Sequence, residues 1–176
     1  AHQWFGDAVS PADWADLWLN EAFATYGEWM WLDHTGLHTL EDIAGEALGA
    51  RQEPTEPTGR PSVENLFGYE RYDGGAVVVH ALRLELGDEQ FFELLRRWVA
   101  DNDGASRTTE DFVALAEELS GVELDAFFDA WLGALQALMS RGIYQKAAAV
   151  VGVSGGGCVA AAFHMVGGSR PEEAPP

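Results

Sequence analysis

Apolar residues recur every three or four positions along most of the first 132 residues, and this is the spacing of one buried helix face. No strand pattern of comparable strength precedes residue 147, and no internal repeat is present. The sequence therefore predicts a mainly α fold, a packed set of helices. The pattern predicts helices over residues 11–32, 40–48, 75–86, 89–101 and 110–120, followed by a helical stripe over 124–132.

The predicted helix over residues 11–32 has a start signal and one anomaly. Ser10 can cap its N-terminus, and Pro11 suits the first helical position. Glu21 falls on the apolar side of the helix. Because an ionised carboxylate on an apolar face needs a partner, a metal ion is a good candidate for that partner.

Local signals also mark the ends of later helices. Gly87 predicts a stop for the apolar helix before it, and Asp88 can cap the helix that follows. Thr108 and Asp111 approximate a capping box, and Gly121 ends that helix.

Two stretches lack helical patterning. Residues 51–61 hold three prolines and must form a loop, and residues 62–71 are ambiguous. After residue 133 the composition shifts to Ala, Gly and Val without clear periodicity. We therefore expect a helical unit over residues 1–133. The hypothesis for residues 134–176 is an atypical Ala/Gly-rich tail, disordered or not native to the domain.

The charge of the chain excludes one class of partner. The 176 residues carry a formal net charge of −19, which repels phosphate backbones, so we expect no nucleic-acid partner. The longest apolar stretch is shorter than the roughly 20 residues that span a bilayer, so no membrane span is expected. The lone Cys158 excludes an intrachain disulfide framework. Compartment and oligomeric state stay open.

His2 and Glu21 are the first candidates for chemistry. Catalytic zinc takes three protein ligands and leaves one position for water, and two of the ligands are often His residues four apart on a helix. A His and a Glu with eighteen residues between them can be two ligands of one ion. Such pairs occur by chance in any chain, so the flanking residues decide the interpretation.

Those flanking residues resemble the gluzincin aminopeptidases of peptidase family M1. Residues 1–7 read AHQWFGD and residues 16–26 read DLWLNEAFATY. The family carries His-Glu-Xaa-Xaa-His, then eighteen residues, then Glu, within His-Gln-Trp-Phe-Gly and Trp-Leu-Asn-Glu. On that match His2 is the second His ligand and Glu21 the distal Glu ligand of one zinc ion.

A second block resembles the family's Tyr-Xaa-(Lys/Arg)-Gly-Ala segment. Residues 68–76 read GYERYDGGA, so Tyr72 matches the catalytic Tyr that hydrogen-bonds the oxyanion. Tyr69 is a competitor, but it lacks the downstream Gly-Ala at the right spacing. Gly74 stands where the family has a basic residue, so the chain departs from the family in the substrate or backbone contacts at this position, but not in the phenol. The resemblance runs to about residue 132.

Other residues invite a functional interpretation that we do not favour. His34 and His38 have a metal-compatible spacing, but a surface or packing role is favoured. His80 is expected to be a core histidine whose hydrogen bonds are satisfied. Residues 155–157 are not a phosphate loop. Five tryptophans are expected in the core rather than in a ligand cage: Trp4, Trp14, Trp18, Trp29 and Trp31.

The resemblance implies the helical C-terminal part of a thermolysin-like metallopeptidase catalytic domain. It implies a zinc aminopeptidase that removes N-terminal residues from peptides. The first His ligand, the Glu base, a β-rich domain and an amino-group-binding segment would lie upstream of Ala1, so we expect a fragment that is inactive alone. Two alternatives stay open: a pseudoenzyme or binding module on the same scaffold, and a gluzincin hydrolase with a non-peptide substrate.

Overall fold

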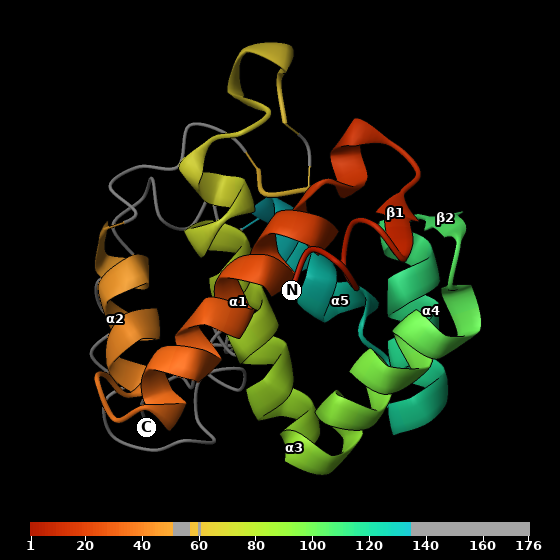
Figure 1. Ribbon diagram of the computed structural model, residues 1–176. Helices are drawn as coiled ribbons and strands as arrows, with labels where there is room; N and C mark the ends of the chain where they lie inside the picture. Colours follow the sequence, from red (N-terminus) through yellow and green to blue (C-terminus); the bar gives the residue numbers. More distant parts are fainter. Residues whose placement is uncertain (51–56, 60, 135–176) are drawn as a thin grey trace, which may run out of the picture.

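The computed structural model describes residues 1–50, 57–59 and 61–134, and these are mainly helical, as predicted. The hypothesis about the tail falls on residues 135–176, which lie outside the described part. The elements, in chain order, are β1 (Val9–Pro11), η1 (Trp14–Asp16), α1 (Trp18–His34), α2 (Leu40–Ala50), η2 (Val63–Asn65), η3 (Tyr69–Arg71), α3 (Asp73–Asn102), β2 (Ala105–Arg107), α4 (Thr109–Ser120), α5 (Asp125–Phe128) and the π-helical turn η4 (Asp129–Ala134) (Figure 1).

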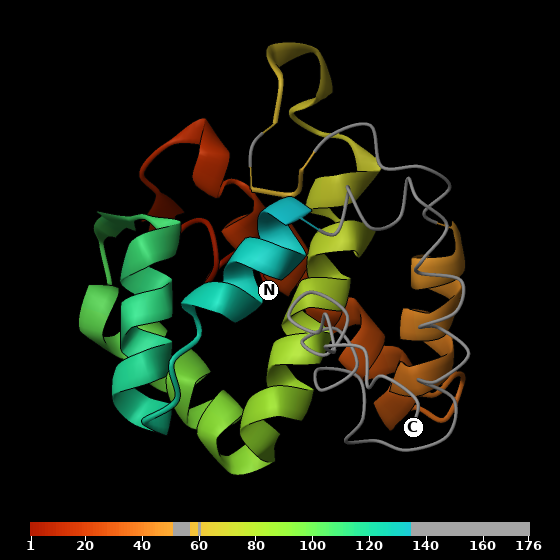
Figure 2. The ribbon, with the colours of Figure 1, turned by 180° about the vertical axis from the view of Figure 1, so that it is seen from behind.

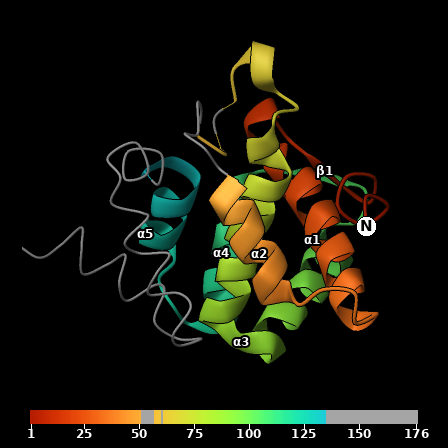
Figure 3. The same ribbon diagram turned by 90° about the vertical axis from the view of Figure 1, so that its left-hand side faces the viewer.

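The helices pack around α3. In Figure 1 α1 crosses in front of α3, with α2 beside it. The view from behind in Figure 2 shows α5 and α4 on the opposite face. In the side view of Figure 3, α1 and α5 lie on opposite sides of the molecule with α3 between them. None of the helices in the described part is long and apolar enough to cross a bilayer.

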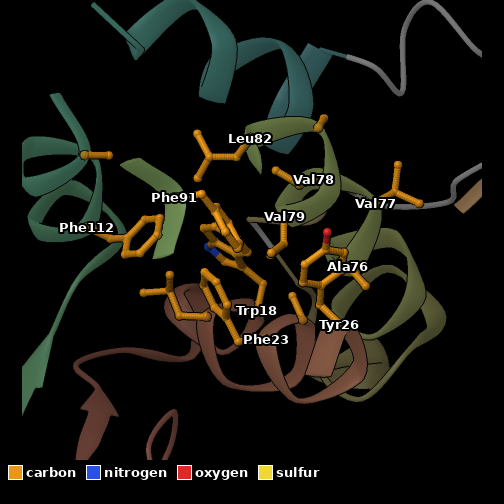
Figure 4. Close-up of a cluster of buried hydrophobic side chains, with 14 of the residues drawn as sticks. Trp18, Phe23, Tyr26, Ala76, Val77, Val78, Val79, Leu82, Phe91 and Phe112 are labelled. Atoms are coloured by element: carbon orange, nitrogen blue, oxygen red, sulfur yellow. The ribbon is translucent and has the colours of Figure 1, made fainter. Parts of the chain in front are cut away.

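The core is built from aromatic and branched side chains of α1, α3 and α4. Figure 4 shows Trp18 and Phe23 of α1 close to Phe91 of α3 and Phe112 of α4. The ring of Phe112 meets that of Phe23 edge-on, with centroids 5.4 Å apart. Such edge-to-face pairs add about 0.5–1.5 kcal/mol beyond the area they bury. The core thus holds α1 and α4 against α3.

The start of α1 differs from the prediction. Ser10 and Pro11 lie in β1, which pairs in parallel with β2, and α1 begins at Trp18. The Ser10 hydroxyl donates to the carbonyl of Gly6 rather than capping a helix. Pairing with β2, about ninety residues away in sequence, overrides the local cap signal, because backbone groups on β1 find partners there. The sequence predicted neither strand.

The predicted helix ends at Gly87 and Gly121 and the predicted capping box are confirmed, whereas the capping role of Asp88 stays a prediction. Gly87 has φ +76°, a conformation that divides α3 into two helical segments. The side chain of Asp88, predicted to be a cap, accepts hydrogen bonds from Arg83. Thr108 and Asp111 form the capping box of α4, and Gly121 ends it with φ +67°. These signals are local, so the sequence alone carries them.

Three of the five tryptophans expected in the core are exposed. Trp18 and Trp29 are buried, as predicted. Trp4, Trp14 and Trp31 are 57%, 61% and 63% exposed, so that prediction was wrong for them. Trp14 lies in η1, before α1 starts, and therefore outside the helical stripe on which its burial was inferred.

Asp16 is a buried carboxylate that joins η1 to the N-terminus of α4. One of its oxygens accepts hydrogen bonds from the backbone N–H and the hydroxyl of Thr109, both at 2.8 Å. The Thr109 hydroxyl in turn accepts from the indole N–H of Trp18 at 3.0 Å. The other Asp16 oxygen accepts from the backbone N–H of Asp13 at 3.2 Å. This network places the first residue of α1 against α4.

We expect Asp16→Ala to lower the free energy of unfolding by about 2–3 kcal/mol, because buried donors then lack their charged acceptor. Asp16→Asn, which keeps one acceptor oxygen, should lose less. Asp103→Ala removes an exposed carboxylate and serves as the control. Urea unfolding followed by tryptophan fluorescence measures the difference. Equal losses for Asp16→Ala and Asp103→Ala would contradict the role of the network.

Candidate metal centre and catalytic tyrosine

His2 is presented by a series of hydrogen-bonded turns that precede β1. The backbone N–H of Trp4 donates to the carbonyl of Ala1 at 2.9 Å, and that of Asp7 donates to the carbonyl of His2 at 3.0 Å. The ring of Phe5 stacks on Phe23 of α1 with centroids 4.5 Å apart. The segment that carries His2 is therefore held against α1.

Gly6 permits this close approach. Its φ is +137°, and a Cβ at this position would lie 3.0 Å from the carbonyl oxygen of His2 and 3.4 Å from the side-chain nitrogen of Asn20. A side chain would be strained there and would also press on its neighbours. Gly6 thus brings the turn beside Asn20, the residue that precedes Glu21 in α1.

The structure brings together His2 and Glu21, the two residues predicted to be ligands of one ion. Nε2 of His2 lies 2.9 Å from Oε2 of Glu21. The His2 side chain is 56% exposed and the Glu21 side chain 13%, so the pair lies at the edge of solvent. A ring nitrogen and a carboxylate oxygen fit the donor preference of zinc. Within the described residues no group of three or more His, Cys, Asp or Glu could hold a metal.

Tyr72 directly precedes α3. Burial raises the pKa of its phenol, and the nearby negative charge of Glu21 raises it further. The phenol therefore keeps its proton at neutral pH and can donate a hydrogen bond. Tyr72 lies three residues before Gly75, and Gly75 meets Ala22, the neighbour of Glu21.

Tyr69, the competitor for the catalytic role, is held elsewhere. Its hydroxyl donates to the backbone carbonyl of Ala47 near the end of α2, at 2.6 Å. This contact anchors η3 to α2 and accounts for Tyr69 as a structural residue. The geometry favours Tyr72 as the catalytic candidate.

Two glycines near the start of α3 were not singled out for packing by the sequence. A Cβ on Gly75 would lie 2.6 Å from Cβ of Ala22, the neighbour of Glu21. A Cβ on Gly74 would lie 2.8 Å from Oε2 of Glu70, a buried residue. A larger residue at position 74 would therefore require the Glu70 side chain to move. The glycines themselves were the available signal, but Ala22, the close neighbour of Gly75, is distant in sequence.

Comparison with known proteins finds one family. A family model described as "Peptidase family M1 domain" matches residues 1–131. The chain is 32% identical over 145 residues to "Aminopeptidase M1-D" of Oryza sativa, covering 74% of this chain and 16% of that protein. It is 31% identical over 147 residues to "Probable aminopeptidase 2" of Sulfurisphaera tokodaii, covering 75% and 18%. The chain thus spans about one sixth of the length of these relatives.

Solved structures of a zinc metallopeptidase and of an aminopeptidase have a similar fold. A crystal structure of an M1 zinc metallopeptidase from Deinococcus radiodurans matches with a TM-score of 0.69 and 35% identity, covering 75% of this chain and 30% of that one. A structure of Legionella pneumophila aminopeptidase A in complex with aspartic acid matches with a TM-score of 0.63 and 28% identity, covering 74% and 15%. The predicted fold class is confirmed.

We expect Gly75→Ala to lower the free energy of unfolding by about 1–3 kcal/mol, because the added methyl group overlaps Ala22. The loss should shrink when Ala22→Gly is combined with it, since the double variant restores the space. Gly45→Ala is the matched control: position 45 is helical with nothing within 4 Å of the new Cβ. That control should be neutral or stabilising. Additive losses in the double variant would show that the two residues do not clash.

Proposed function

The chain belongs to peptidase family M1, and on this premise we propose that it is the helical part of the catalytic domain of a zinc aminopeptidase. The intact enzyme would remove N-terminal residues from peptides. The observation that carries the proposal is the convergence of Nε2 of His2 and Oε2 of Glu21 at 2.9 Å, with Tyr72 at the start of α3, the helix that meets α1 at Ala22 and Gly75.

His2 and Glu21 would hold the zinc ion. His2 comes from the turn before β1, and Glu21 comes from the first turn of α1, so the two ligands are positioned by different elements. The close contact of Gly6 with Asn20 and the stacking of Phe5 on Phe23 keep those elements together. The chemistry that zinc supplies when bound is Lewis-acid activation of water and of the scissile carbonyl.

Tyr72 would stabilise the charge that develops on the carbonyl oxygen of the substrate. Its phenol stays protonated because burial and Glu21 raise its pKa. A fixed donor in this position lowers the barrier more than it stabilises the bound peptide, because the oxygen becomes an anion only during the reaction. The third protein ligand and the general base are roles that the resemblance gives to residues before His2.

In the intact enzyme, Tyr72→Phe should lower kcat by a factor on the order of 10²–10³ while zinc content stays at one ion per molecule. Tyr69→Phe is the matched control, because it also removes a phenol hydroxyl, but one that donates to the carbonyl of Ala47. Hydrolysis of an amino-acid p-nitroanilide measures kcat, and atomic absorption measures zinc. Comparable activity of Tyr72→Phe and wild type would remove Tyr72 from the mechanism.

For zinc, His2→Ala and Glu21→Ala should each abolish stoichiometric binding by the intact enzyme, because a site that loses one of three ligands binds far more weakly. His38→Ala, at an exposed position, is the control. The 176-residue chain alone should bind zinc poorly and show no turnover, since two ligands do not close the site. Micromolar or tighter stoichiometric zinc with aminopeptidase turnover in this chain would contradict that expectation.

The zinc and aminopeptidase assays, together with an assay of epoxide hydrolysis, separate the rival functions. Zinc binding with hydrolysis of an epoxide, but not of aminoacyl substrates, would support a hydrolase with a non-peptide substrate. An intact protein that folds without zinc or turnover would support a binding module.

A further inference from the structure

A chain of hydrogen bonds joins α1 to α3. The guanidinium of Arg83 donates to both oxygens of Asp88, at 2.7 and 3.0 Å, across the Gly87 kink. The same guanidinium donates to the hydroxyl of Tyr26 at 3.4 Å. That hydroxyl lies 3.1 Å from Nδ1 of His80, and both residues are buried. His80 is thus the core histidine that the sequence predicted.

The direction of each bond follows from which groups can only donate. Arg83 has no acceptor, so the Tyr26 oxygen accepts from it. The buried phenol proton of Tyr26 also needs an acceptor, and of the side chains that meet its hydroxyl in the described part of the chain only His80 can accept, through Nδ1. Burial raises the pKa of Tyr26, so the phenol keeps this proton. His80 is therefore neutral in this arrangement and carries its single ring proton on Nε2.

These hydrogen bonds join α1, which carries Glu21, to α3, which begins directly after Tyr72. Tyr26 follows Glu21 by five residues in α1, and His80 follows Tyr72 by eight residues in α3. The Ala22–Gly75 contact and the Tyr26–His80 bond are therefore two successive points at which α1 is fixed to α3.

We propose that these hydrogen bonds form an acid-sensitive clamp between α1 and α3. When Nδ1 of His80 is protonated, it no longer accepts a hydrogen bond from the Tyr26 hydroxyl, and the packing of α1 against α3 becomes less stable. The device goes beyond the proposed function, and a stability measurement tests it whether or not the enzyme is an aminopeptidase. Its consequence for the site is a looser spacing between Glu21 and Tyr72 at acid pH.

The charges around His80 act in opposite directions. Burial lowers its pKa and is the largest cause, Arg83 of α3 lowers it further, and Glu41 of α2 raises it. From α1 the facing titratable group is Tyr26. In the described part of the chain, the charged groups that shift the pKa of His80 come from α2 and α3.

The sign of the pH effect follows from linkage. Because the pKa of His80 is lower in the folded state, the unfolded chain binds more protons. The stability that neutral His80 contributes is therefore complete above the ordinary histidine pKa of about 6.5 and is lost as the pH falls through the folded value.

The test is urea unfolding of the purified chain at several pH values between 8 and 5.5. The unfolding equilibrium constant of the wild type, divided by that of His80→Gln, should rise by up to about tenfold per pH unit below pH 6.5. Gln keeps an acceptor for Tyr26 but does not titrate. His38→Gln, at an exposed position, should follow the wild type. A constant ratio for His80→Gln across this range would overturn the proposal.

A second measurement tests the proposal if His80→Gln fails to fold. Nitrogen-15 NMR of the imidazole rings in the wild type reports tautomer and protonation directly. At pH 8 the ring of His80 should be neutral with its proton on Nε2. A proton on Nδ1 at that pH, or a titration midpoint at or above the ordinary histidine value of about 6.5, would overturn the clamp.

Discussion

The close crossing of α1 over α3 at Ala22 and Gly75 is the contact on which the other features of the molecule depend. A Cβ on Gly75 would lie 2.6 Å from that of Ala22, so the helices approach more closely than ordinary side chains permit. Glu21 precedes one of these residues and Tyr72 lies three before the other. The crossing therefore brings a candidate zinc ligand and a candidate oxyanion donor into one neighbourhood.

The start of α1 is held by a second, independent set of contacts. Asp16 accepts from Thr109 at the N-terminus of α4, and β1 pairs with β2 just before that helix. A carboxylate beside a helix N-terminus is also favoured by the partial positive charge there. Because Glu21 lies in the first turn of α1, its position depends on where this helix begins.

Sequence reasoning succeeded where the signal was local. The Thr108–Asp111 capping box and the left-handed Gly121 need only neighbouring residues, and both form as predicted. It was wrong where a distant segment decides the outcome. Ser10 and Pro11 have the chemistry of a helix start, but pairing with β2 places them in a strand. Trp31 is a large apolar residue and was expected in the core, but it is exposed. The spacing of apolar residues along a helix does not show which of them the neighbouring elements cover.

The sequence by itself determined the family, the mainly helical fold and the identity of His2, Glu21 and Tyr72 as candidates, because these rest on motifs and periodicity along the chain. Only the tertiary structure decided that Nε2 of His2 meets Oε2 of Glu21. It also decided that Tyr69 donates to α2 and that the Tyr26 hydroxyl meets Nδ1 of His80. The physical reason is that hydrogen bonds and close contacts between distant residues depend on how whole helices pack.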